Sequence, residues 1–161
     1  MSTINAYYLV NLGSVELFLP AEDILYLASS NEVIEKEEVN CLRFADRWHP
    51  VYSLSNACLP AMGLQNNDRK AILLNSASAN RGAAMALGCL SIVKMRLASS
   101  PCPLPPLMRK LSPIEGLLRH NDSWHLYSTA ATIQIYFEKV LSYGSINENQ
   151  YPHGNYVGMV G

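Results

Sequence analysis

The sequence predicts an all-β fold of barrel type that is followed by one C-terminal helix. Short apolar or alternating runs recur from Ala6 to Tyr127, with Gly, Pro, Asn and Asp turn signals every ~8–15 residues. Hydrophobic residues make up 49% of the 161 residues and charged residues 16%, so the chain has ample apolar material for a core. Helical periodicity is clear only after Ser128, whereas a parallel α/β sheet needs helices between its strands.

The N-terminal segment predicts a hairpin followed by a helical turn and a loop. The runs AYYLVNL (6–12) and VELFL (15–19) flank Gly13-Ser14, a pattern typical of two paired strands. Pro20 opens PAEDILYL, where a proline at the first helical position and acids in the first turn predict a short helical turn. The charged segment 31–38 is expected to be a loop.

A second hairpin is predicted between residues 39 and 54. VNCLRFA (39–45) and WHPVYSL (48–54) flank Asp46-Arg47, and apolar residues of the second run repeat at period two. Because Pro50 has no amide proton to donate to a neighbouring strand, its strand is expected to lie at a sheet edge or to be bulged.

The middle of the chain predicts one buried strand and one interrupted pair. Residues 56–62 are expected to form a helical turn, and KAILLN (70–75) fits a strand buried on both faces. Two strand patterns between Ala83 and Leu97 are separated by Gly88, where a bend or bulge is expected. The prolines of segment 98–106 predict an extended, irregular connection.

The C-terminal part predicts a third hairpin and the helix. The runs 114–119 and 124–127 are joined by the turn formers of HNDS. Thr129 can cap a helix whose apolar residues repeat at 3/4 spacing, and Gly144 is expected to end it. The expected organisation is one domain over 1–144 and a flexible tail over 145–161.

The charge pattern excludes several classes of partner. Twelve Lys and Arg against thirteen Asp and Glu give a formal charge of -1, with no basic stripe for nucleic acid. The longest nearly uncharged apolar stretch, 82–93, is much shorter than the ~20 residues of a membrane-spanning helix. The N-terminus has no basic residue at its start and contains Glu16, which disfavours a signal peptide. We therefore expect a cytoplasmic protein with no membrane span.

No pattern of reactive residues indicates an enzyme, a metal site or a cofactor. The four cysteines do not form closely spaced pairs, so we expect reduced and mostly buried thiols: Cys41, Cys58, Cys89 and Cys102. The four histidines lack a recognisable nucleophile beside them, and phosphate-binding glycine loops are absent. One alternative stays open, a small-molecule-binding or enzymatic β-barrel whose cavity is lined by Trp48, His49, Cys89, Trp124 and His125.

The order of the elements resembles a known family. The segment LRFADRWHPVYSL (42–54) resembles the central part of CheW-like chemotaxis coupling domains, in which an NLRG-type turn precedes a strand containing Pro-Val and Leu. AMALGCLSIVKM (84–95), IEGLLRHNDSWHLYS (114–128) and the opening hairpin are similar to other strands of that family in the same order. The likeness extends roughly from Ala6 to Leu141. The family's Arg-Gly turn is replaced here by Ala45-Asp46, and its acidic residue after Pro-Val by Ser53.

The resemblance implies a non-catalytic adaptor built from two intertwined, SH3-like, five-stranded antiparallel barrels. Such adaptors couple a chemoreceptor, or by extension a pilus-control receptor, to the regulatory domain of a histidine kinase. No cofactor is implied. Because the altered turn lies in the family's contact region, the substitution bears above all on the chemoreceptor contact.

The second predicted hairpin carries the candidate partner-binding residues. The turn residues are expected to be exposed, while the aromatic ones serve either as anchors or as core residues. This candidate site consists of Arg43, Phe44, Asp46, Arg47 and Trp48, with Tyr52 as a further possible anchor.

Overall fold

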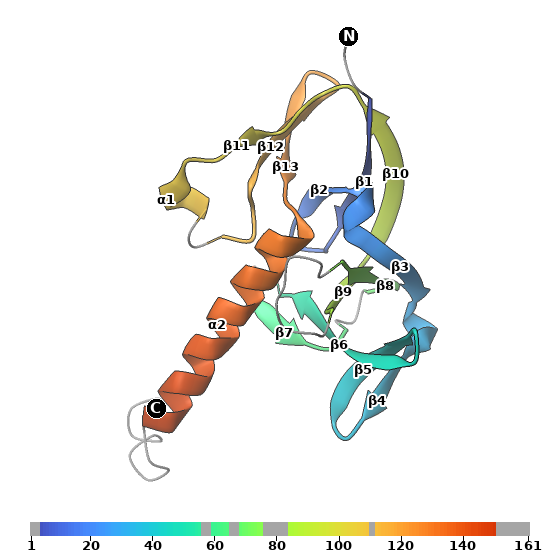
Figure 1. Ribbon diagram of the computed structural model, residues 1–161, viewed down its shortest axis with the longest axis vertical. Helices are drawn as coiled ribbons and strands as arrows, with labels where there is room; N and C mark the ends of the chain where they lie inside the picture. The colour runs from blue at the N-terminus through green and yellow to red at the C-terminus, as the bar shows by residue number, and fades with distance from the viewer. Residues whose placement is uncertain (1–3, 56–58, 65–67, 76–83, 110–111, 151–161) are drawn as a thin grey trace.

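Thirteen strands of the described chain form two sheets, and a long helix follows the last strand (Figure 1). The computed structural model describes residues 4–55, 59–64, 68–75, 84–109 and 112–150, with side chains up to residue 141. A mostly β chain with one long C-terminal helix confirms the predicted fold class.

Strands from the two ends of the chain form one sheet, which we call the terminal lobe. Its order is β10-β1-β2-β13-β12-β11. The strands are β1 (Asn5–Asn11), β2 (Glu16–Pro20), β10 (Ser91–Leu97), β11 (Cys102–Pro103), β12 (Gly116–His120) and β13 (Ser123–Tyr127).

The strands between them form the second sheet, the central lobe. Its order is β3-β8-β9-β6-β5-β4, with β7 also paired to β6. The strands are β3 (Ile24–Ser29), β4 (Val33–Lys36), β5 (Val39–Phe44), β6 (Arg47–Leu54), β7 (Pro60–Met62), β8 (Lys70–Leu74) and β9 (Ala86–Cys89). Two 3₁₀ turns flank β3: η1 (Ala21–Asp23) and η2 (Ser30–Glu32).

The two lobes have the same strand order. In each sheet the two middle strands of this order form the single parallel pair. They are β9 and β6 in the central lobe and β2 and β13 in the terminal lobe. The terminal lobe follows this order as a circular permutation, because its last two strands, β1 and β2, come first in the chain. Each lobe has six strands in this order, and the central lobe has β7 in addition. Each sheet therefore has more strands than the five expected for each barrel.

The helix α2 (Ala130–Gln150) joins the lobes through a shared core (Figure 1). Thr129 caps it, since its hydroxyl accepts the Thr132 amide at 3.2 Å, and the Asp23 carboxylate of η1 accepts the Ala130 amide at 2.8 Å. The shared core combines terminal-lobe, central-lobe and helical side chains, including Val10, Leu17, Leu19, Leu54, Ile72, Leu74, Leu87, Ile133 and Phe137. A second helix, α1 (Pro106–Arg109), is short.

The three predicted hairpins are confirmed, while two predicted non-strand segments are wrong. After a three-residue turn, residues 24–29 form β3 instead of continuing the helical turn from Pro20. The segment 31–38, expected to be a loop, contains β4 and a turn in which Glu37 and Glu38 have φ of 52° and 67°. Charged residues are compatible with β4 because it is an edge strand.

Pro50 lies inside an interior strand. It is the last residue of β6 that pairs with β5, and β7 pairs with β6 only from Tyr52 onward. The missing amide therefore coincides with the change of partner. Residues 60–62 form β7 rather than a helical turn, and 56–58 lie outside the described residues.

Three further predictions were wrong in detail. Gly88 lies within β9 instead of bending the chain, and a Cβ there would lie 2.5 Å from an Asp68 carboxylate oxygen, so a larger residue would require the Asp68 side chain to move. The helix α2 continues past Gly144 to Gln150, because one glycine costs only about 1 kcal/mol in a helix and no proline follows within it. Cys102 is exposed at the edge strand β11, whereas Cys89 is buried.

Candidate functional site

The β5–β6 turn projects charged side chains from the central lobe. Ala45 and Asp46 both adopt left-handed backbone conformations, with φ of 52° and 62°, which are typical of a two-residue hairpin turn. Arg43 pairs with Asp46 across the turn at 3.4 Å, and both side chains are mostly exposed. Arg47 is also exposed. We call residues 42–49 the central tip.

Trp48 forms an aromatic platform on the central tip. The Arg43 guanidinium lies 5.8 Å from its ring centroid and the Lys36 ammonium of β4 lies 4.7 Å from it. Trp48 itself is half-buried and pairs with Arg43 across the hairpin. Cations over an indole are attracted by the ring's quadrupole. The central tip therefore presents a tryptophan flanked by positive charge.

The other two aromatic candidates face the protein interior. Phe44 stacks on Tyr26 at 5.2 Å and packs against the central-lobe core. Tyr52 lies 5.8 Å from Phe137 in the shared core. The Tyr26 hydroxyl donates to Glu32 at 2.6 Å, which raises the pKa of Tyr26 and lowers that of Glu32. Phe44 and Tyr52 are therefore packing residues rather than exposed anchors.

The structure reveals a second tip with the same construction. The β12–β13 turn places Asn121 and Asp122 at φ of 51° and 61°, and Arg119 pairs with Asp122 at 3.7 Å. The Arg119 guanidinium lies 5.7 Å from the ring of Trp124, its cross-strand neighbour. We call residues 118–125 the terminal tip.

The sequence contains the signal for this equivalence. Residues 42–49 read LRFADRWH and residues 118–125 read LRHNDSWH, so Leu, Arg, Asp, Trp and His recur at the same places. Both tryptophans of the protein occupy the same position of their hairpin. Arg119, Asp122 and Trp124 are not among the residues predicted from the sequence, although this repeat indicates them.

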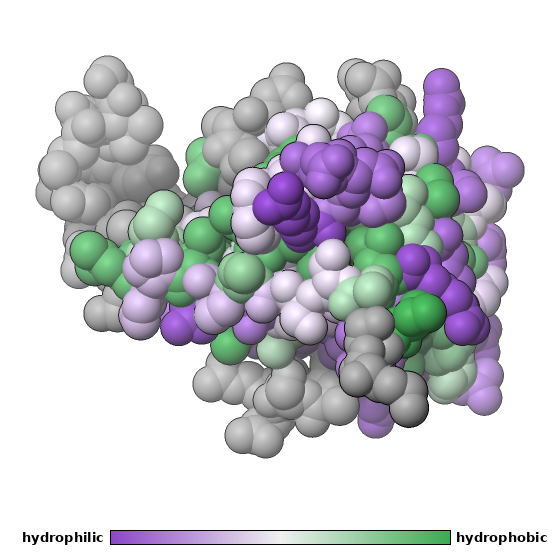
Figure 2. All heavy atoms as spheres, turned by 90° about the horizontal axis from the view of Figure 1, so that it is seen from above, coloured by the Kyte–Doolittle hydropathy of each residue, from purple (hydrophilic) through white to green (hydrophobic). Residues whose placement is uncertain are grey.

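The tips lie in different regions of the molecule. In Figure 1, β12 and β13 stand in the upper part of the view, while β4 and β5 lie at the lower right. Figure 2 looks down on the upper face, where hydrophilic and hydrophobic residues are interspersed over short distances.

The residues of the alternative cavity are not brought together. His49 is buried beside the Ala84 carbonyl at 2.9 Å, whereas His125 packs on Phe18 in the terminal lobe. Trp124 is 53% exposed. Burial, with the nearby Asp68 charge as a smaller cause, raises the pKa of Cys89 to about 12, so its thiol is a poor nucleophile at neutral pH.

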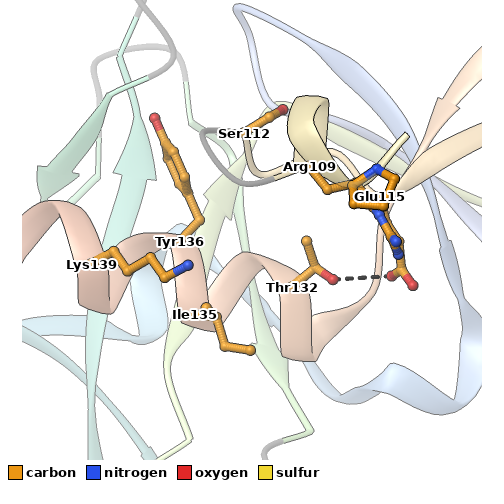
Figure 3. Close-up of a pocket in the computed structure, with 8 residues that line it drawn as sticks. Arg109, Ser112, Glu115, Thr132, Ile135, Tyr136 and Lys139 are labelled. Atoms are coloured by element: carbon orange, nitrogen blue, oxygen red, sulfur yellow. Dashed lines mark hydrogen bonds between the residues drawn. The ribbon is translucent and has the colours of Figure 1, made fainter. Parts of the chain in front are cut away.

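Two surface pockets lie elsewhere on the described chain. One of about 390 Å³ opens at the end of the terminal lobe, beside Tyr7, Glu22 and Tyr127. The other, of about 300 Å³, lies between α1 and α2 (Figure 3). Within the described residues, no group of three or more His, Cys, Asp or Glu side chains is placed to hold a metal ion. Neither described helix has the length and apolar character needed to span a bilayer.

Comparison with known proteins supports the fold. The crystal structure of the scaffolding protein TtCheW from Thermoanaerobacter tengcongensis is similar to this chain with a TM-score of 0.53 at 12% identity. The match covers 78% of this chain and 88% of that one. No family model and no curated protein sequence matches the chain.

Proposed function

We propose that this chain is a non-catalytic signalling scaffold that couples a chemoreceptor or a pilus-control receptor to the regulatory domain of a histidine kinase. The likeness of its fold to a scaffolding protein supports this function. The repeated Arg, Asp and Trp of the two tips are the observation that carries it.

Each tip is built as a docking element. Tryptophan and arginine are over-represented among the residues that dominate binding energy at protein interfaces. A two-residue turn with a cross-strand Arg–Trp contact holds them in place before a partner arrives, so little ordering entropy is lost on binding. The affinity then depends on these surface side chains and needs no reactive pocket.

The central tip favours an acidic partner surface. Arg43 and Lys36 lie over the Trp48 ring, Arg47 is exposed beside it in the sequence, and Asp46 is paired with Arg43. The terminal tip has one arginine and one aspartate in the equivalent places. We therefore assign the kinase domain to the central tip, and we expect that complex to weaken as salt is added.

The direct test is size-exclusion chromatography with the regulatory domain of a histidine kinase from the same cell. At tens of micromolar the two proteins should co-elute. Separate elution of two folded proteins would contradict the proposed function.

Two substitutions then test the role of the central tip. Arg43→Glu should weaken the complex and leave the melting temperature nearly unchanged, because it reverses a charge that faces the acidic partner and the Arg43 side chain is mostly exposed. Trp48→Ala should weaken it by roughly 30-fold, as expected for an interface anchor. Glu16→Arg, an exposed reversal on β2 outside the tip, is the matched control and should bind normally.

A further inference from the structure

The pocket between α1 and α2 lies on a part of the surface that the tips do not use. We propose that this groove is a docking surface for an acidic amphipathic helix of a partner protein. Glu115 in its wall precedes β12, whereas the terminal tip lies at the far end of that strand. The inference therefore does not rest on kinase docking.

One wall of the groove is a continuous stripe of α2. Thr132, Ile135, Tyr136 and Lys139 line the pocket at helical spacings of three and four residues. The adjacent stripe, which includes Ile133 and Phe137, is buried in the shared core. The helix α2 thus has a second side-chain ridge, of the kind that another helix packs against.

Apolar side chains line the groove and lie beside it. Ile135 of the α2 wall is 50% exposed. On α1, next to the residues that line the groove, Leu107 is 81% exposed and Met108 is 59% exposed. Ile135 and Tyr136 on the α2 wall and Pro106 on the α1 wall match the apolar face of an amphipathic helix.

The charges of the groove select an acidic occupant. Arg109 enters from α1 and Lys139 from α2, on opposite sides of the space (Figure 3). The carboxylate of the wall, Glu115, is engaged by its own protein, because the hydroxyls of Thr129 and Thr132 donate to it at 2.7 and 3.0 Å. The two cations outnumber the one carboxylate of the lining, and this excess positive charge beside Ile135 and Tyr136 complements carboxylates beside leucines.

The volume agrees with this occupant. About 300 Å³ is at the small end of ligand pockets, and the space is open along α2. A few anchoring side chains of a helix would fill it, with the rest of that helix lying on the rim.

A designed peptide tests the proposal on the full chain. The probe is a labelled helical peptide of about 15 residues with leucines at helical spacing and glutamates elsewhere; the control peptide has lysines in place of the glutamates. Fluorescence anisotropy should show that the glutamate peptide binds at least tenfold more tightly, and that this preference shrinks with added salt.

Charge reversal provides the protein-side test. The double variant Arg109→Glu with Lys139→Glu should lose about tenfold in affinity for the glutamate peptide and gain affinity for the lysine peptide. The control variant Lys94→Glu with Arg96→Glu reverses one exposed lysine and one exposed arginine on β10, and should bind like the parent. Ile135→Asp should weaken both peptides, because it removes an apolar anchor.

Several outcomes would overturn the proposal. These are equal binding of the two peptides, no binding of either, or an unchanged affinity in the Arg109 and Lys139 double variant with an unchanged melting temperature. Sedimentation of the protein alone as a dimer that Ile135→Asp dissociates would show instead that a second copy covers the groove.

Discussion

The central and terminal tips are the same hairpin in two different surroundings. Both have a buried leucine at the base, an Arg–Asp pair across the turn and an arginine over a tryptophan. Yet Trp48 is half-buried, with Lys36 also over its ring, whereas Trp124 is 53% exposed.

The neighbouring edge strand accounts for much of this difference. In the central lobe β4 pairs with four residues of β5 and reaches Leu42 at the base of the tip. In the terminal lobe β11 pairs with only two residues of β12 and stops at Leu117. The comparison teaches that the turn is a local property of eight residues, while the exposure of its aromatic ring depends on the adjoining strand.

The largest expected effect on stability tests whether the buried leucines at the base of the two tips are equivalent. Leu42 and Leu118 are 1% and 0% exposed, each in the core of its own lobe. Leu42→Ala and Leu118→Ala should each lower the free energy of unfolding by about 2–5 kcal/mol, through lost burial and a cavity. Urea denaturation measures both losses, and a near-zero loss for only one of them would break the equivalence of the lobes.

The next effect distinguishes the two histidines that follow the tryptophans. The His49 Nδ1–H donates to the Ala84 carbonyl inside the protein, whereas half-buried His125 makes ring contacts with Phe18 and His120. His49→Ala should cost about 1–3 kcal/mol of stability, because it leaves a buried carbonyl without its donor. His125→Ala is the matched variant, and a larger loss there would reverse the expected order.

A smaller effect on stability is expected when the first turn residue of each tip is replaced by that of the other. Ala45 holds a left-handed conformation that is unfavourable for alanine, while Asn121 holds the same conformation in the terminal tip and asparagine tolerates it better. Ala45→Asn should stabilise the protein by about 0.5 kcal/mol, and Asn121→Ala should destabilise it by a similar amount. Thermal unfolding of both variants measures the pair; changes of the same sign would mean that the two turns respond differently.

The smallest effect concerns the charged pairs. Both aspartates are almost fully exposed, and such pairs contribute little to stability. Asp46→Asn and Asp122→Asn remove the charge but keep a residue that tolerates the left-handed turn conformation, so each should leave Tm within about 1 °C of the parent. A clear loss of Tm in only one variant would give that carboxylate a structural role its partner tip lacks.

Much of the fold could be predicted because strand and turn signals are local. The hairpins around Gly13, Asp46 and Asp122, the buried strand β8 and the Thr129 cap all follow from neighbouring residues. The predictions were wrong where residues distant in sequence determine the local structure. β4 is a strand because β5 supplies hydrogen bonds to its charged sequence, and at Gly88 the Asp68 side chain occupies the space that a larger residue would need.

Some residues of the candidate site could likewise be placed from the sequence, and others could not. The exposure of Asp46 could be predicted, since a two-residue turn projects its side chains into solvent. Arg47 is exposed as predicted, but it is the first residue of β6, because the turn consists of Ala45 and Asp46. Phe44 could not be assigned from sequence, because an aromatic residue on a strand can face either side until its stacking partner, Tyr26, is known.

The sequence by itself therefore determined the class of fold, the hairpins and the two tip patterns, all of which depend on backbone preferences over a few residues. Only the tertiary structure decided the pairing of β1 and β2 with strands from the far end of the chain, the shared core under α2 and the groove beside it. Those features depend on contacts between residues distant in sequence, whose geometry no local pattern encodes.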